Sequence, residues 1–324
     1  MTLRIAVLGL DHWYAGIPFA QAVVAHPETE LVVIADTDAA HAAEVAGDLG
    51  VAWSDDPAAA LARDDVDAVA CFTSVDRSAA LCIAAAEAGK HIVSVKPLAM
   101  DLAGADAVVE AVERAGVVFV PSEARRTSAL ALRLRELTDE LGPWISGTFS
   151  MNSAVPSPWP GQSGPSWWLD PSKAPGGGWI DHAVYQIDRM RWLFDSPVRD
   201  VSGVYGRLRH EDLAVEDYGH AVFMLESGAV VTVEDTWIAE SGDSLTEMHL
   251  VGERGSVHLV SRTGTLAVTR DRAWVEEPAA DDRFDTLDVL VRAVLHSEVS
   301  TAGVRSSRET LDAALRFYAN AVRL

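Results

Sequence analysis

The sequence has only two cysteines, no long apolar run and far fewer basic than acidic side chains. Cys71 and Cys82 have neither CxxC nor metal-ligand spacing, so we expect reduced core residues rather than a disulfide framework. No apolar run approaches the roughly 20 residues of a membrane span, and the N-terminus lacks a signal peptide's basic start and cleavage site, which predicts a cytoplasmic protein. The formal net charge of −22 argues against binding to nucleic acid or anionic membranes.

Two kinds of catalytic motif are also missing. There is no HExxH, no paired HxH and no cysteine ligand set, so no metal site is expected. There is no GxSxG elbow, which removes the most recognisable serine hydrolase signature.

The first 121 residues alternate apolar runs with helical stretches. Near-continuous apolar strands separated by helices are typical of a parallel, doubly wound α/β sheet of the Rossmann type. We therefore predict a dinucleotide-binding domain over residues 1–121. The strand-like runs are 3–9, 31–36, 51–53, 66–72, 91–95 and 117–121.

Residues 122–324 have a different pattern. Helical stretches at 125–142 and 179–194 flank a segment rich in Pro, Gly, Ser and Trp at 153–178. Valine- and threonine-rich runs with glycine-marked turns follow, which indicates antiparallel strands. We predict an α+β domain with a mostly antiparallel sheet, closed by a helix over about 307–323. The runs are 200–209, 218–228, 229–238, 245–252, 256–260 and 265–270.

The stretch VLGLDHWYAG at 7–16 resembles the turn of a dinucleotide fingerprint, but Asp11 stands where a second glycine is usual. Either the turn holds a pyrophosphate, with Asp11 pointing away or offset by His12, or Asp11 is simply the N-cap of the next helix. In the first case the cofactor-binding residues of the turn are Gly9, Leu10, Asp11, His12 and Trp13.

The second strand-like run ends at Asp36, followed by Thr37. An acidic side chain here accepts hydrogen bonds from the adenosine ribose, and its charge repels a 2′-phosphate. No arginine follows within several residues, so NAD is favoured over NADP. The alternative is that Asp36 and Asp38 cap the next helix.

Several ordered motifs resemble the Gfo/Idh/MocA family, named for glucose-fructose oxidoreductase and inositol dehydrogenase. They span nearly the whole chain: FTSVDRS at 72–78, EAGKHIVSVKPLAMD at 87–101, the arginines at 125 and 126, WWLDPSKAPGGG at 167–178 and DHAVYQIDRMRWLF at 181–194. The chain departs from the family pattern at four places. Asp11 replaces a glycine, Thr73, Ser74 and Val75 replace Thr-Pro-Asn, Val95 replaces a glutamate, and Tyr185 replaces a histidine.

The resemblance implies a site around Lys96 and Pro97, with Thr73 and Ser74 beside the cofactor. Burial is expected to lower the pKa of Lys96 and make it a proton acceptor or a donor to the substrate oxygen. Pro97 fixes the backbone, through a cis bond in one interpretation.

Asp181 and Tyr185 are four residues apart and share a helix face. We predict a relay in which Lys96 and Tyr185 contact the reacting hydroxyl while Asp181 orients the lysine or the substrate, with either Lys96 or Tyr185 holding the proton. His182 is a reserve proton carrier. The tryptophans at 159, 167, 168 and 179 either pack on the C–H faces of a sugar or cyclitol or pack between the domains, and an arginine bonds the substrate hydroxyls or an acidic group. The predicted substrate-binding residues are Arg125, with Arg126 as its alternative, Trp167, Trp168 and His182.

Together these features predict an NAD-dependent oxidoreductase acting on a sugar, cyclitol or related polyol, assembled as a homodimer or homotetramer. A variant within this class retains NAD tightly and oxidises its substrate only transiently. The alternative from another class is a non-catalytic sugar-binding or sensor protein with a degenerate cofactor site.

Overall fold

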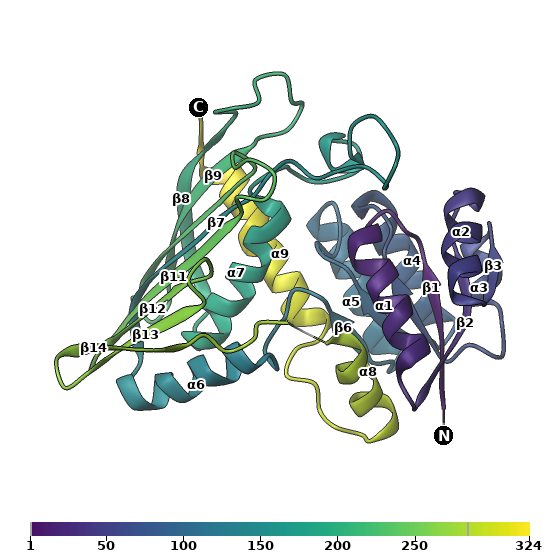
Figure 1. Ribbon diagram of the computed structural model, residues 1–324, viewed down its shortest axis with the longest axis horizontal. Helices are drawn as coiled ribbons and strands as arrows, with labels where there is room; N and C mark the ends of the chain where they lie inside the picture. Colours follow the sequence, from purple (N-terminus) through teal and green to yellow (C-terminus); the bar gives the residue numbers. More distant parts are fainter. Residues whose placement is uncertain (1, 284) are drawn as a thin grey trace.

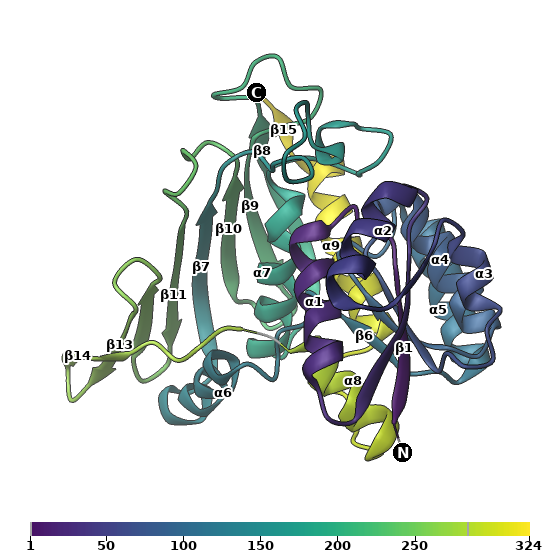
Figure 2. The same ribbon diagram turned by 45° about the vertical axis from the view of Figure 1, so that its right-hand side comes forward.

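The computed structural model describes residues 2–283 and 285–324, and it contains two sheets with helices between and around them (Figures 1 and 2). The first sheet has six parallel strands in the order β3-β2-β1-β4-β5-β6. This order confirms the predicted doubly wound Rossmann-type sheet. Its strands are β1 Leu3–Leu8, β2 Thr29–Ala35, β3 Ala52–Ser54, β4 Ala68–Cys71, β5 His91–Ser94 and β6 Phe119–Pro121.

Five helices connect these strands and cover both faces of the sheet (Figure 2). The central strands β1 and β4 are buried almost throughout, which explains their uninterrupted apolar sequences. The helices are α1 Trp13–Ala25, α2 Ala39–Leu49, α3 Pro57–Leu61, α4 Val75–Glu87 and α5 Leu102–Ala115.

The second sheet has nine strands in the order β14-β13-β12-β11-β7-β10-β9-β8-β15. Every neighbouring pair is antiparallel except β7 with β10 and β8 with β15, so the prediction of a mostly antiparallel sheet is confirmed. The strands are β7 Trp144–Asn152, β8 Val198–Gly206, β9 Tyr218–Leu225, β10 Val230–Thr236, β11 Leu245–Gly252, β12 Ser256–Val260, β13 Thr265–Arg270, β14 Ala273–Pro278 and β15 Val322–Arg323.

Helices α7 and α9 lie between the two sheets, as Figure 1 shows. The final helix ends at Asn320 rather than at 323, because Ala321 is extended and the next two residues pair with β8. The helices of this half are α6 Ala129–Leu141, the 3-10 turn Trp167–Leu169, α7 Ile180–Leu193, α8 Thr286–Leu295 and α9 Val304–Asn320.

Helix α8 packs against β5, β6 and α1 of the first sheet, and α9 contacts α5 and β6. The C-terminal quarter of the chain therefore supports both halves of the molecule. The boundary at 121/122 separates the two sheets and stays a prediction for the domains as independent units. Across the described residues, no helix is both long and apolar enough to span a bilayer.

Glu123, just after β6, provides a test of how the two halves are joined. Its buried carboxyl accepts a hydrogen bond from Ser307 of α9, and burial raises its pKa from 4.5 to about 7. Because the folded pKa exceeds the unfolded one, this group destabilises the fold increasingly as pH rises from 4.5 to 7. Glu123→Gln should therefore leave stability unchanged at pH 4.5 and raise it at pH 8 by up to about 3 kcal/mol. Urea unfolding at both pH values measures this. Glu110→Gln, on exposed helix surface, is the matched control and should show no such pH dependence.

Candidate active site

The connection from β1 to α1 makes a tight turn at Gly9, beside the end of β4. Gly9 has a φ of +80°, and a Cβ there would lie 2.4 Å from Cγ2 of Thr73. The turn lies where the strand order reverses between β1 and β4, which is where open α/β sheets bind ligands. The backbone thus retains the glycine that a dinucleotide turn needs.

Gly9→Ala tests this geometry. A methyl group would clash with Thr73 and strain a left-handed backbone, so we expect loss of NAD binding and a lower thermal midpoint. Gly50→Ala is a matched control, because Gly50 also has positive φ (+69°) but no atom within 4 Å of an added Cβ. It should lower the midpoint through backbone strain alone and leave NAD binding intact.

Some backbone N–H groups of the turn donate hydrogen bonds within the protein, and others have no acceptor in the part of the chain that the structure describes. Gly9 donates to Ala35 O at 2.7 Å and His12 donates to Phe72 O at 3.0 Å. Among the described residues, the N–H groups of Trp13 and Tyr14 at the start of α1 make no hydrogen bond. Free N–H groups at a helix N-terminus attract anions.

Asp11 is not the N-cap of α1, so that alternative was wrong. The N-cap is His12, which makes no side-chain cap bond. The Asp11 carboxylate instead accepts the N–H of Ser74 at 2.7 Å and pairs with Arg77. His12 does not offset this charge either, because burial lowers its pKa to about 3 and keeps it neutral. The partner is Arg77, which sequence reasoning missed because it lies 66 residues away.

Asp36 is buried at the end of β2, and both of its carboxylate oxygens are engaged by the backbone. One accepts the N–H of Leu10 at 2.5 Å and the other accepts the N–H of Asp38 at 2.7 Å. Asp38, and not Asp36, caps α2. The Asp36 side chain therefore fixes the turn to the end of β2, and Thr37 accepts a hydrogen bond from Arg77 at 2.9 Å.

Lys96 and Asp181 form a buried ion pair between the two halves. Lys96 follows β5 and precedes Pro97 through a cis peptide bond, and only 2% of Lys96 is exposed. Its ammonium group donates to the side-chain Oδ1 and to the backbone oxygen of Asp181. Trp237 donates to the other carboxylate oxygen at 3.1 Å, so the orientation of Asp181 is fixed.

The expected lowering of the pKa of Lys96 was wrong. Burial is the largest single effect and favours the neutral amine, but the charge and hydrogen bond of Asp181, together with Tyr185 and Tyr14, outweigh it, and the pKa rises above the ordinary value. Burial likewise opposes ionisation of Asp181, yet nearby His182, Lys96 and Trp237 bring its pKa to about 2. Lys96 is therefore a cation and a hydrogen-bond donor, and not a proton acceptor.

Aromatic rings surround the Lys96 ammonium. It lies 4.7 Å from the ring centroid of Trp168 and 5.4 Å from that of Tyr185. Arg125 lies 4.3 Å from the centroid of the same Tyr185 ring. These contacts stabilise both cations in a poorly hydrated site.

A cavity of about 670 Å³ opens beside the ion pair. His182 lines it, and its Nδ1 is 3.5 Å from Asp181 Oδ2. Burial lowers the pKa of His182 to about 4, so its imidazole is neutral. Trp167 and Trp168 do not line this cavity, whereas Arg125 does and Arg126 instead pairs with buried Asp188. The charged and polar lining residues of the cavity include Lys96, Arg125, Asp181, His182, Tyr185 and Gln186.

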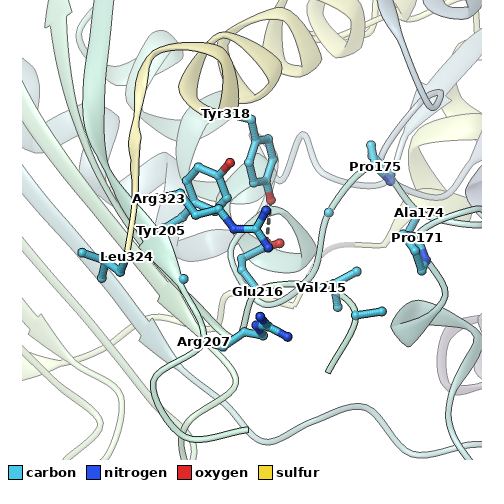
Figure 3. Close-up of a pocket in the computed structure, with 13 residues that line it drawn as sticks. Pro171, Ala174, Pro175, Tyr205, Arg207, Val215, Glu216, Tyr318, Arg323 and Leu324 are labelled. Atoms are coloured by element: carbon cyan, nitrogen blue, oxygen red, sulfur yellow. Dashed lines mark hydrogen bonds between the residues drawn. The ribbon is translucent and has the colours of Figure 1, made fainter. Parts of the chain in front are cut away.

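The glycine run at 176–178 positions the helix that carries Asp181. A Cβ at Gly176 would lie 2.2 Å from the hydroxyl of Tyr318, and one at Gly177 would lie 2.2 Å from the carbonyl of Glu216. Glu216 accepts a hydrogen bond from Tyr318 at 2.6 Å, as Figure 3 shows. It also accepts one from the N–H of Gly177 at 2.7 Å. Glu216 and Tyr318 border the smaller cavity drawn in Figure 3, and the bonds of Glu216 hold the start of α7 in place.

The segment 153–178 arches from the second sheet toward the carboxyl edge of the first (Figure 2). Trp159 stacks on His41 of α2 with ring centroids 3.8 Å apart. Trp167 lies edge-on to His12 at 4.7 Å and donates to the backbone oxygen of Asp11 at 2.9 Å. The tryptophans thus join the two halves over the glycine turn. Trp179 instead stacks on Phe317 in the core.

Sequence comparisons agree with this geometry. A family profile described as "Oxidoreductase family, NAD-binding Rossmann fold" matches residues 3–122, and the profile of the family's C-terminal domain matches residues 139–258. Inositol 2-dehydrogenase 3 of Saccharopolyspora erythraea is 30% identical over 318 residues, covering 91% of this chain and 86% of that protein. The chain belongs to the Gfo/Idh/MocA oxidoreductase family.

Two further proteins show the extent of the similarity. The scyllo-inositol 2-dehydrogenase (NAD(+)) of Bacillus subtilis is 30% identical over 274 residues, covering 82% of this chain and 74% of that protein. The crystal structure of aldose-aldose oxidoreductase from Caulobacter crescentus superimposes with a TM-score of 0.84 at 20% identity, covering 98% and 97% of the two chains. The last comparison supports the shared fold.

The described residues of this Gfo/Idh/MocA chain fit a nicotinamide dinucleotide. His12 Nε2 and Thr73 Oγ1 are buried at the crevice and have no hydrogen-bond partner within the described part of the protein. His12 Nδ1 lies 3.1 Å from the carbonyl of Thr73, which only accepts, so Nδ1 carries the proton and Nε2 is a free acceptor. Unpaired buried polar atoms beside free helix N–H groups are what a polar ligand would satisfy.

Proposed function

We propose that this protein is an NAD-dependent dehydrogenase that oxidises a hydroxyl group of a sugar, cyclitol or related polyol. The observation that carries the proposal is the buried Lys96–Asp181 pair, which borders both the crevice at the end of the first sheet and the polar cavity of 670 Å³. The family supports the same reaction class, and the names of the inositol dehydrogenases cited above support a polyol substrate.

In the proposed reaction, Lys96 binds the substrate oxygen. A bound dinucleotide would supply the hydride acceptor. The Lys96 ammonium has three N–H donors, of which Asp181 takes two, so one remains for the substrate oxygen. Because that group stays charged, it stabilises negative charge developing on the oxygen.

The hydroxyl proton needs a different acceptor. His182 is neutral, and its Nδ1 lies 3.5 Å from Asp181 Oδ2 without a hydrogen bond, so one nitrogen of the neutral ring is unprotonated and can act as the base. We assign proton acceptance to His182 and the binding of substrate hydroxyls to Arg125. Tyr185 holds the two cations on its ring and is a positioning residue in this scheme.

NAD is proposed over NADP because the Asp36 carboxylate lies at the end of β2. Titration calorimetry with each dinucleotide, after a denatured sample has been checked for released cofactor, tests this. A screen of inositols and sugars for NADH formation then tests the reaction. Saturable sugar binding without any NAD binding or released cofactor would favour the non-catalytic sensor instead.

We also propose a homodimer or homotetramer that assembles through the face of the second sheet opposite α7. Ile145 on β7 and Val230 on β10 are 53% and 44% exposed, which is high for large apolar side chains. Light scattering coupled to size-exclusion chromatography should give a dimer or tetramer mass, and a monomer at micromolar concentration would contradict this arrangement.

A further inference from the structure

Arg77 and Asp11 form an ion pair that bridges three connections at the carboxyl edge of the first sheet. Asp11 lies between β1 and α1, and Arg77 lies in the first turn of α4. The Arg77 guanidinium also donates to Thr37, after β2, at 2.9 Å and to Ser74 at 3.3 Å. The ends of β1, β2 and β4 are thereby linked through one side chain.

Arg77 does not stabilise helix α4 through the helix dipole. A cation in the first turn of a helix opposes the helix dipole, which favours negative charge there. The side chains of Arg77 and Asp11 are 37% and 24% exposed, so both charges lie at the protein surface near the turn and are only partly screened by solvent. The favourable interaction of Arg77 in this position is its ion pair with the Asp11 carboxylate.

The charge of Asp11 is a problem for the cofactor proposed above. The carboxylate lies two residues before Trp13, where the free N–H groups of α1 begin. An unpaired carboxylate beside a pyrophosphate would repel it, and at short range this repulsion is substantial even in a partly hydrated site. Arg77 and the N–H of Ser74 hold the carboxylate on the α4 side and neutralise it.

We propose that Arg77 is a positioning residue for the dinucleotide, replacing in function the glycine that Asp11 displaces. It cancels the charge of Asp11 and keeps that carboxylate away from the α1 N-terminus, so that the pyrophosphate can approach the turn. This inference rests on the proposed NAD dependence. It predicts that the effects of Arg77 and Asp11 on cofactor affinity are coupled.

A double-mutant cycle measured by calorimetry tests the coupling. The ligands are NAD and ADP-ribose, since ADP-ribose has the pyrophosphate but does not reach Lys96. We expect Arg77→Ala to weaken both ligands by tenfold or more, because it unmasks Asp11. In the Asp11→Gly background the same change should cost less than threefold. Arg77→Lys, which keeps the charge, should lose less than Arg77→Ala, and thermal unfolding confirms that each variant is folded.

Each other outcome identifies what has failed. Equal losses from Arg77→Ala in both backgrounds, or no loss at all, would overturn the role of Arg77 while leaving NAD dependence intact. If the wild-type protein does not bind NAD but Asp11→Gly does, Asp11 closes the site despite Arg77, and the inference is wrong. If no folded variant binds either ligand and none releases a cofactor on denaturation, the proposed NAD dependence itself fails.

Discussion

Lys96→Met should reduce polyol oxidation by about 10³-fold or more while changing NAD affinity by less than threefold. The variant keeps an unbranched apolar side chain but removes the ammonium group, which lies over the Trp168 and Tyr185 rings and is the charged donor to the substrate oxygen. Loss of one such donor to a developing negative charge costs on the order of 10²–10³ in rate, and here the cation is lost as well. Steady-state kinetics together with NAD calorimetry measure both parts of the prediction.

Removing the Lys96 ammonium also leaves the buried Asp181 carboxylate without its ion-pair partner. Asp181 is 4% exposed, and breaking a buried ion pair on one side costs about 3–5 kcal/mol. The control is therefore Lys96→Met with Asp181→Asn, which should recover stability without recovering turnover. If the double variant regains activity, or if Lys96→Met is as active as the wild type, Lys96 is not the group that binds the substrate oxygen.

His182→Gln should lower kcat/KM for oxidation by roughly 10²- to 10³-fold, the usual worth of a general base. Because the pKa of His182 is about 4, the base is unprotonated over the whole neutral range. The wild-type kcat/KM should therefore show no loss attributable to His182 between pH 8 and pH 5, and should fall only as the pH approaches 4. Measuring kcat/KM against pH, over the range in which the protein stays folded, tests the predicted pH dependence.

Tyr185→Phe is the matched control, since it retains the ring on which Lys96 and Arg125 pack. Its activity should stay within threefold of the wild type. A large loss of activity with Tyr185→Phe and none with His182→Gln would show that the tyrosine hydroxyl, and not His182, accepts the substrate proton. That result would agree with the relay predicted from the sequence alone.

The periodic parts of the sequence predicted the fold well, because burial on both faces of a parallel sheet produces continuous apolar runs. Strand β7 was missed, although it lies at the centre of the second sheet. Its sequence WISGTFSMN has as many polar as apolar side chains and a glycine, because several of its side chains lie on the more accessible face. Helix α8 was missed as well, and α9 was placed three residues too late at its C-terminal end.

Motifs in the sequence singled out Gly9 and Lys96 at strand ends and Asp181 on a helix, and the structure brings Lys96 and Asp181 into contact. Pairings between residues far apart in the chain were missed. The sequence could not indicate that Arg77 would meet Asp11, nor that Trp237 would bond Asp181. The direction of the Lys96 pKa was wrong for the same reason, because burial was considered without its partner.

The most direct test of the account is transfer of a deuterium label. Purified protein is incubated with NAD and polyols deuterated at their carbinol carbons, and the dinucleotide is analysed by mass spectrometry, with Lys96→Met as the blank. We predict that the label appears in the reduced nicotinamide at a rate matching substrate oxidation and is absent with Lys96→Met. Saturable polyol binding by folded protein, with no label in free or protein-bound dinucleotide, would contradict the assignment as a dehydrogenase and favour a binding protein on the same fold.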